Sequence, residues 1–353
     1  MPADFAARVV RWQKTHGRHA LPWQQTRDPY RVWLSEVMLQ QTQVQTVIGY
    51  YQRFLQRFPD VQALAGASLD EVMGLWAGLG YYSRARNLHQ CAICIVAQHG
   101  GEFPASAAGL QTLPGVGAST AAAIAALCYG QREAILDANV KRVLTRYLGF
   151  AGDMASNTQQ QLLLEQARAL LPQRNLRPQM LRYTQGMMDL GATVCLPRSP
   201  DCAVCPLGAT CVARSQGRQR DYPVKSRSVR RSTESIWMLW MQRPDGALWL
   251  RRRPSPGVWA NLYCFPWFDS RERLVANLPA RLRVRLRDEP AFSHTLTHKD
   301  LYLHPLRLLT GSRTIAQLEG AWFSADACSR LGMPAPVRRL LQDGGNQPKE
   351  VEG

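Results

Sequence analysis

Four cysteines lie close together in the chain, and their thiols could hold a metal centre. Cys195, Cys202, Cys205 and Cys211 follow the spacing C-x6-C-x2-C-x5-C within a proline-rich loop. Four thiolates ligate either a structural zinc ion or a [4Fe–4S] cluster. Zinc knuckles usually combine two short cysteine pairs, whereas this loop has one short pair and two outlying cysteines. The spacing therefore predicts a metal site and favours the iron–sulfur cluster over zinc.

Two carboxyl groups that are far apart in the chain could perform acid–base chemistry. Glu36 lies in the helical stretch 33–42, where its neighbours are mostly apolar or amide side chains. A helical glutamate is most often a solvated charge, but such neighbours can raise the pKa of a carboxyl group toward that of a general acid. Asp137 follows an apolar stretch and begins a helix, so its simplest role is an N-cap, which is compatible with a catalytic role.

A glycine-rich turn could bind a phosphate group. The segment 113–117, LPGVG, directly precedes the helical stretch that begins at Ala118. Two glycines in a tight turn expose backbone N–H groups, and a phosphate oxygen can bind at the following helix start without any reading of sequence. The alternative is an ordinary turn between two helices.

The other cysteines are interpreted as packing residues. Cys91 and Cys94 form a second C-x-x-C, but they lie on an apolar helical face beside Ile95. Cysteine is among the most buried residue types, so packing is favoured over metal or redox chemistry. We interpret Cys128, Cys264 and Cys328 in the same way. Nine cysteines are too sparse for a disulfide scaffold, which indicates a reducing cytoplasm, with nucleoid association if the source is bacterial.

The elements that must position these groups are predicted to be helical up to about Leu190. Apolar residues recur at helical spacing, and short Gly/Pro segments separate the helices. The predicted helical ranges are 28–43, 44–57, 68–77, 83–99, 118–129, 138–148, 157–171 and 176–190.

The chain changes character after the cysteine loop. Residues 214–231 are strongly basic and almost free of apolar side chains, which is typical of a linker or of an arm along phosphates. Alternation then predicts strands: a hairpin around Arg243–Gly246, a strand over 281–287 with four arginines on one face, and another over 297–305. The arginine face could be solvated or could face nucleic acid. The end of the chain is polar, which predicts a loose tail.

Charge and composition narrow the class of partner. The chain of 353 residues has 43 Lys and Arg against 26 Asp and Glu, a formal net charge of +17, which indicates a polyanionic partner, nucleic acid first. Anionic membrane surfaces attract the same charge, but the apolar runs are far too short to span a bilayer. No secretory signal is visible at the N-terminus.

Together these segments resemble the helix-hairpin-helix DNA glycosylases that carry an iron–sulfur loop, and among them the MutY-type adenine DNA glycosylases. The matching stretches are 21–23 (LPW), 30–42 (YRVWLSEVMLQQT), 78–87 (GLGYYSRARN), 113–117 (LPGVG), 135–143 (ILDANVKRV) and the cysteine loop. The stretches 257–266 and 292–298 resemble the Nudix-like C-terminal domain of that family. The resemblance covers nearly the whole chain.

The resemblance implies a mainly α, two-lobed helix-hairpin-helix glycosylase fold followed by a smaller α+β Nudix-like domain. The implied divisions are 1–213 for the glycosylase domain, with the helix-hairpin-helix near 110–130 and the iron–sulfur loop at 195–211; 214–232 for the basic linker; 233–345 for the recognition domain; and 346–353 for a flexible tail. It implies one [4Fe–4S] cluster, a monomer, no membrane association, and duplex DNA with A:8-oxoguanine or A:G mispairs as partner.

The same resemblance implies roles for individual residues. Glu36 protonates the adenine and later helps to activate water, Asp137 stabilises the sugar cation, and Asn139 orients this pair. The implied substrate and DNA contacts are Trp23, Leu39 and Gln185 around the adenine, Gln41 and Tyr81 beside the oxidised base, Gly115, Gly117, Ser119 and Lys141 on the DNA, and Thr297 and His298 on 8-oxoguanine. Thr297 stands where the family commonly has serine.

One position and one missing motif distinguish this chain from its relatives. Bifunctional members resembling endonuclease III carry a lysine, which forms a Schiff base, where this chain has Ser119. A serine cannot form an imine, so the resemblance points to a monofunctional glycosylase. The C-terminal domain lacks the glutamate-rich helix of Nudix hydrolases, which indicates a recognition module. The rival interpretations are an endonuclease III-like enzyme for oxidised pyrimidines or G:T mispairs, a non-catalytic DNA-binding or redox-sensing protein, and a zinc-binding transcription factor.

Overall fold

The computed structural model describes residues 2–174, 176–226, 231–311 and 318–344. These residues fold into two compact units, one formed by Met1–Gly66 with Asn87–Ser228 and the other by Ala67–Arg86 with Val229–Gly353. The predicted tail at 346–353 and residues 227–230 of the predicted linker lie outside the described residues. None of the described helices is long and apolar enough to cross a membrane.

The first unit is helical, and the helical ranges expected from the sequence are confirmed within a few residues, including 68–77, which belongs to the second unit. The structure adds helices that the periodicity did not single out, because they are short or lie at the chain start. The elements are α1 (Pro2–His16), η1 (Pro22–Gln24), α2 (Pro29–Leu39), α3 (Val44–Arg57), α4 (Val61–Gly66), α6 (Ser83–His99), α7 (Ala107–Gln111), α8 (Ala118–Tyr129), α9 (Ala138–Leu148), α10 (Asn157–Ala169), α11 (Leu176–Thr193), η2 (Gly208–Thr210), α12 (Val212–Ser215) and η3 (Gln219–Asp221).

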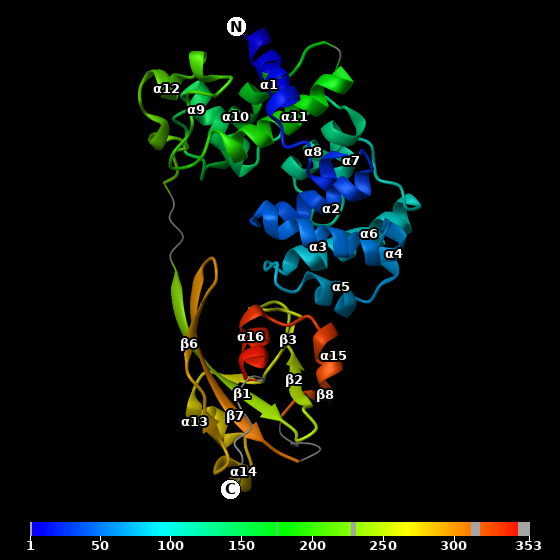
Figure 1. The fold of residues 1–353 in the computed structure, drawn as a ribbon, viewed down its shortest axis with the longest axis vertical. Coiled ribbons are helices and arrows are strands. Elements are labelled where there is room, and N and C mark those ends of the chain that lie inside the picture. Colours follow the sequence, from blue (N-terminus) through cyan, green and yellow to red (C-terminus); the bar gives the residue numbers. More distant parts are fainter. Residues whose placement is uncertain (1, 175, 227–230, 312–317, 345–353) are drawn as a thin grey trace. The chain divides into compact units, whose positions relative to one another are not determined.

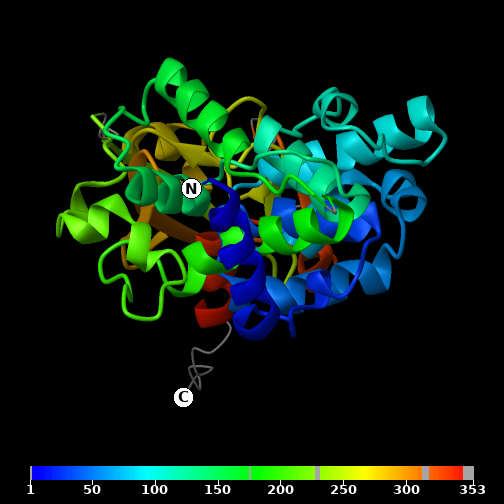
Figure 2. The ribbon, with the colours of Figure 1, turned by 90° about the horizontal axis from the view of Figure 1, so that it is seen from above.

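Helix α11 organises the core of this unit, since it packs against α1, α8 and α9 (Figure 1). Figure 2 shows α1, in dark blue, beside the green helix α11. Two glycines permit the close approach: a Cβ at Gly186 would lie 2.8 Å from Val9 Cγ1, and one at Gly191 would lie 2.8 Å from Asn139 Cβ. Larger residues would push α11 away, so Gly186 sets the distance of α11 from α1, and Gly191 sets its distance from the start of α9.

The second unit is built on a mixed sheet of eight described strands. Strands β1 (Ser232–Gln242) and β7 (Lys299–Leu309) are parallel over their whole length. The predicted hairpin is confirmed, because β1 pairs antiparallel with β2 (Leu248–Arg252) across the turn that Gly246 closes. The remaining strands are β3 (Tyr263–Cys264), β4 (Trp267–Phe268), β5 (Arg287–Asp288), β6 (Phe292–Thr295) and β8 (Ala321–Phe323), and the helices are α5 (Leu69–Trp76), α13 (Arg271–Ala276), α14 (Ala280–Arg283), α15 (Ala325–Arg330) and α16 (Ala335–Gly344).

The predicted strand over 281–287 is wrong. The chain forms the helical turn α14, and only its end, Arg287, enters the short strand β5. Leu282 lies in α14 and Leu286 follows the turn after this helix, and both pack in the apolar cluster of this unit. Val284 is left 86% exposed. Alternation over only seven residues therefore did not distinguish the two-residue period of a strand from the period of a helix.

Candidate active site

Glu36 lies in the last two turns of α2, which begins at Pro29 with Asp28 as its N-cap. The Asp28 carboxylate accepts the Tyr30 N–H at 2.9 Å, and proline at the first position fixes the helix start. The helix buries most of its residues and contacts α8. Glu36 is partly exposed as a residue, although protein surrounds its carboxyl group.

Asp137 caps α9, as the sequence predicts. Its Oδ1 accepts the Val140 N–H at 2.6 Å. The residue before it is fixed as well, because Ser119 Oγ accepts the Leu136 N–H at 3.1 Å. The predicted DNA-contact residue Ser119 therefore joins the first turn of α8 to the chain that delivers Asp137.

The two carboxyl groups influence each other. Burial raises the pKa of Glu36 to about 7, and the negative charge of Asp137 contributes to this rise. Burial also raises the pKa of Asp137, but the N–H groups of Val140 and Asn139 and the charges of Arg142 and Lys141 oppose this shift. The electrostatic effect of Asp137 on Glu36 places the two groups in one environment, with Glu36 as the member that retains a proton near neutral pH.

The predicted phosphate-binding turn connects α7 to α8 and forms a helix-hairpin-helix. Gly115 has φ +74°, and a Cβ there would lie 2.6 Å from Asn87 Cβ, so this position requires glycine. Gly117 is the N-cap of α8 and has no atom within 4 Å of an added Cβ. Its side lies open, as a backbone that receives a phosphate requires.

Trp23 and Gln185 adjoin one buried polar network that was not predicted from the sequence. Trp23 is buried in η1, and Gln185 is buried in α11. Asp189 is fully buried and accepts from Arg18 Nε at 2.7 Å, from Gln24 Nε2 at 3.3 Å and from Gln185 Nε2 at 3.1 Å. The Gln185 amide is thereby oriented, with its donor directed to Asp189. A lone acid inside the apolar stretch 187–191 was the signal in the sequence.

Two further predicted residues lie where α2 ends. Leu39 is the last residue of α2 and is partly exposed. Gln41 is exposed and has φ +55°, a left-handed conformation that a non-glycine residue rarely adopts. The neighbouring Gln40 contacts α8, because its Nε2 donates to Thr120 Oγ1 at 3.5 Å. The backbone strain at Gln41 accompanies an exposed side chain, as an inserting residue requires.

Asn139 and Lys141 are both held by side chains. Asn139 Oδ1 accepts from Arg142 Nη2 at 2.9 Å, and Arg142 also donates to the Gly191 carbonyl at 2.6 Å. Lys141 Nζ donates to Gln160 Oε1 at 2.5 Å. Burial lowers the pKa of Lys141, although the charge of Asp137 opposes this.

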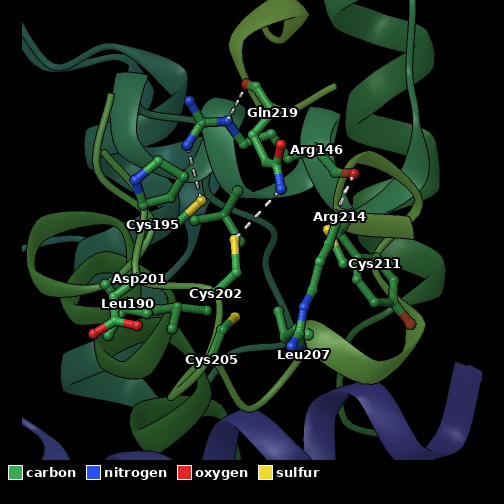
Figure 3. A pocket seen from close by; sticks show the side chains of 15 residues that line it. Arg146, Leu190, Cys195, Asp201, Cys202, Cys205, Leu207, Cys211, Arg214 and Gln219 are labelled. Carbon is green, nitrogen blue, oxygen red and sulfur yellow. Dashed lines mark hydrogen bonds between the residues drawn. The ribbon is translucent and has the colours of Figure 1, made fainter. Parts of the chain in front are cut away.

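The four cysteines of the predicted metal loop surround one small space. Figure 3 shows Cys195, Cys202, Cys205 and Cys211 around it, and the same cavity is lined by apolar residues, among them Val143, Leu190 and Leu207. Burial raises the pKa of Cys205 to about 11, with the neighbouring thiols adding to the shift. Among the residues that the structure describes, no group of three cysteine, histidine or acidic side chains meets the geometry for a single metal ion.

Two side chains donate to the sulfur atoms of this loop (Figure 3). Arg146 Nη1 donates to Cys195 Sγ at 3.4 Å, and Gln219 Nε2 donates to Cys202 Sγ at 3.8 Å. Arg146 is almost fully buried and also donates to the carbonyls of Leu196, Pro197 and Gln219. Arg146 was not predicted from the sequence, although an arginine on the apolar face of an amphipathic helix signals a buried partner.

The second unit contains the remaining predicted residues in a pocket of about 520 Å³. One wall is the loop 78–83 with Arg86, and the other is formed by 257–260 and 294–298. Tyr81 OH and Thr297 Oγ1 form a hydrogen bond of 2.8 Å across it, and His298 is exposed at the rim. Tyr81 has φ +46° and is 42% exposed. Tyr81 is thus an exposed aromatic residue in a left-handed backbone conformation.

Comparison with known proteins gives two domain matches. Residues 34–167 match the model of the HhH-GPD superfamily base excision DNA repair protein, and residues 237–343 match the NUDIX domain. A thermostable thymine-DNA glycosylase of known structure superimposes with a TM-score of 0.54 at 29% identity, over 61% of this chain and 97% of that chain. The mainly helical fold with a smaller Nudix-like unit is thus confirmed.

Curated relatives cover almost the whole chain. The adenine DNA glycosylase of Buchnera aphidicola subsp. Acyrthosiphon pisum is 33% identical over 344 residues, which are 96% of this chain and 97% of that protein. The human adenine DNA glycosylase is 44% identical over 224 residues, which are 61% of this chain and 40% of that protein. The chain therefore belongs to the adenine DNA glycosylases, hydrolases of the HhH-GPD superfamily of base excision DNA repair proteins.

Proposed function

We propose that this adenine DNA glycosylase removes adenine that is mispaired with 8-oxoguanine or guanine in duplex DNA, and that Glu36 and Asp137 carry the chemistry. The observation that carries the proposal is the placement of the two carboxyl groups: α2, which carries Glu36, packs on α8, and Ser119 of α8 holds the residue before Asp137. The charge of Asp137 accordingly helps to raise the pKa of Glu36. Enzymes that break a glycosidic bond use this division of labour: one carboxyl group as acid and one carboxylate that stabilises the cation.

The reaction begins when the adenine is extruded from the base stack, because its glycosidic bond is inaccessible inside the duplex. Glu36 protonates adenine N7, which converts the base into a leaving group. As the bond breaks, positive charge develops on the sugar, and the Asp137 carboxylate stabilises it or bonds to it transiently. Water then completes the hydrolysis, activated by the Glu36 carboxylate, so that the base leaves and the strand remains intact.

The network around Asp189 suits recognition of the extruded base. Asp189 accepts a hydrogen bond from Gln185 Nε2, so the Gln185 carbonyl oxygen is oriented away from this acid. That oxygen can accept a hydrogen bond from the adenine amino group. Trp23 and Leu39 supply the apolar surface for the ring, and Asn139 with Arg142 holds the start of α9. Gly115, Gly117, Ser119 and Lys141 lie on the turn and helix starts that would contact phosphates.

We place recognition of the opposite base at the pocket of the second unit. Tyr81 and Gln41 are exposed residues with positive φ, and each can enter the duplex beside that base. Thr297 and His298 supply a hydroxyl and an imidazole to its edge. The Tyr81–Thr297 hydrogen bond supports this assignment, because it brings the loop of one wall and the hairpin of the other within reach of one ligand.

A strand-cleavage assay tests the reaction class. On a duplex with one A:8-oxoguanine pair, we expect strand breaks only after alkali treatment, because Ser119 stands where a lyase step would need an imine-forming lysine. A thymine-glycol duplex serves as the control and should remain intact under both conditions. Breaks without alkali, or excision only from thymine glycol, would overturn the proposal.

We further propose that Cys195, Cys202, Cys205 and Cys211 hold one [4Fe–4S] cluster. The four residues line one apolar cavity, and hydrogen bonds from Arg146 and Gln219 to two of the sulfurs are of the kind that tunes such clusters. Hydrolysis consumes no electrons, so the cluster would supply a structural link or tune DNA binding.

Cys202→Ser is expected to lose the brown colour and the iron of the purified protein, because a hydroxyl is a poor ligand for the cluster. The measurement is the visible spectrum together with iron and zinc analysis. Cys94→Ser, outside the loop, is the matched control and should retain wild-type iron. A colourless wild-type protein that contains zinc would reject the cluster.

The pH dependence of excision follows from Glu36. Because burial and Asp137 raise its pKa to about 7, the acid is protonated below that pH and loses its proton above it. We expect the single-turnover rate of excision to be highest on the acid side and to fall about tenfold per pH unit well above pH 7. A rate that remains constant between pH 6 and pH 9 would contradict the assignment.

A further inference from the structure

The loop that carries Tyr81 belongs structurally to the unit built by the C-terminal residues. Its segment, Ala67–Arg86, is separated from Val229 in the sequence by the larger part of the helical unit, yet it forms one compact unit with Val229–Gly353. Helix α5 precedes the loop, and the first turn of α6 follows it. The loop itself has positive φ at Gly78, Gly80 and Tyr81. Whatever fixes α5 therefore also fixes the approach of Tyr81 to Thr297.

One carboxylate of α5 is bound by two adjacent strands. Asp70 Oδ1 lies 3.2 Å from Arg252 Nη2, and Asp70 Oδ2 accepts from Tyr263 OH at 3.2 Å. Arg252 and Tyr263 are directly paired residues of β2 and β3, so the two strands present their donors side by side. Each carboxylate oxygen thus has its own donor, and the carboxylate is fixed in orientation as well as position.

Other contacts also hold the segment Ala67–Arg86 in place on the rest of its unit. A Cβ at Gly74 would collide with the Arg330 carbonyl oxygen, so the middle of α5 packs directly on α15. Beyond the loop, Arg86 Nη1 donates to the Ala260 carbonyl at 2.9 Å, and Tyr82 OH donates to the Met333 carbonyl at 3.3 Å. Unlike these backbone contacts, the contact of Asp70 is an ion pair with Arg252, and the Asp70 side chain is 38% exposed. It can therefore be altered without disturbing the core.

We infer that Asp70, held by Arg252 and Tyr263, is a positioning residue that sets the specificity for the base opposite the adenine. It fixes α5 so that Tyr81 and Thr297 lie on the two walls of one pocket at hydrogen-bonding distance. The inference rests on the proposed function, because it assigns discrimination to that pocket. Asp70 lies outside the residues that line the pocket, so its loss should change discrimination through position alone and leave the chemical step intact.

The test compares two substrates with the full-length enzyme. The dissociation constants of duplexes with a non-cleavable adenine analogue opposite 8-oxoguanine or opposite guanine give a discrimination ratio, and single-turnover rates give the chemical step. For Asp70→Ala we expect the ratio to fall by about fivefold through weaker binding to the 8-oxoguanine duplex, the size that an exposed ion pair supports. The rate of excision from A:G at saturating enzyme should remain that of the wild type.

Three further variants separate positioning from a general structural effect. Arg252→Ala should lower the ratio by less than Asp70→Ala, because the Tyr263 hydrogen bond to Asp70 remains. The double variant should lower it no further than Asp70→Ala alone, because that change has already removed the Arg252 ion pair. Asp70→Glu should restore part of the ratio. Asp326→Ala breaks an exposed ion pair with Arg330 on α15 and serves as the control, with an unchanged ratio.

The outcomes are distinguishable. A wild-type ratio in Asp70→Ala, or additive losses in the double variant, would overturn the inference while the proposed function stands. A wild-type enzyme that does not prefer 8-oxoguanine over guanine, or does not excise adenine, would instead contradict the proposed function. An equal loss of binding to both duplexes, with a lowered melting temperature, would show a merely structural role and also overturn the inference.

Discussion

Glu36→Gln is expected to slow adenine excision by about 10²- to 10⁴-fold, the range that a general acid contributes. The substitution keeps the size and one carbonyl oxygen of the side chain but removes the proton that adenine N7 receives. Binding to an A:8-oxoguanine duplex should persist, because the contacts that hold the base and the phosphates are on other residues. Single-turnover kinetics and a binding isotherm on the same duplex measure the two effects separately.

Stability provides a second readout for the same variant. The pKa of Glu36 is about 7 in the folded protein and 4.5 in its ordinary state. Between these values the folded protein binds more protons than the unfolded chain, so this group lowers stability as pH rises, by at most about 3 kcal/mol above pH 7. Glutamine has no such dependence. The variant should therefore melt at a higher temperature relative to the wild type at pH 8 than at pH 5.

The control for Glu36 is Glu165→Gln, which changes an exposed glutamate on α10. It should keep the wild-type rate and the wild-type melting curve at both pH values. Excision by Glu36→Gln at the wild-type rate would contradict the assignment of Glu36 as the general acid. A melting difference without a pH dependence would show that the Glu36 carboxyl group lacks the buried environment that raises its pKa.

Asp137→Asn is expected to lower the excision rate by about 10²- to 10³-fold, the size of one lost electrostatic stabiliser of a transition state. Asparagine caps a helix as well as aspartate does, so α9 should still begin at Ala138 and the melting temperature should change little. The variant thus separates the charge of Asp137 from its structural role. Single-turnover kinetics and thermal melting are the measurements.

The residual activity of Asp137→Asn carries further information. The Asp137 charge raises the pKa of Glu36, so its removal should lower that pKa and shift the descending limb of the pH–rate profile toward acid. Asp28→Asn, which changes the N-cap of α2, is the control and should leave the rate and the profile intact. A loss smaller than about tenfold, or an unshifted profile, would separate the two carboxyl groups functionally.

Much of the fold could be predicted because the signals are local. Helices α2, α3, α6, α8, α9 and α11 have caps, glycine stops or apolar faces that are written within their own residues. The β1–β2 hairpin has its turn residues in place. The prediction of a strand over 281–287 was wrong because its local pattern is ambiguous. Its alternation fits a strand and, through Leu282 and Leu286, equally a helical turn, and only packing against the apolar cluster distinguished them.

The chemical groups of this protein could be named from the chain alone: two acids, four thiols, a glycine turn and a basic surplus, each beside residues that restrict its role. Which of these groups act on one another depended on the folded arrangement. The effect of Asp137 on the pKa of Glu36, the hydrogen bonds that three residues donate to Asp189 and the binding of Asp70 by paired strands all join residues distant in the chain. No local pattern encodes such contacts, because they depend on how closely separate helices and strands pack.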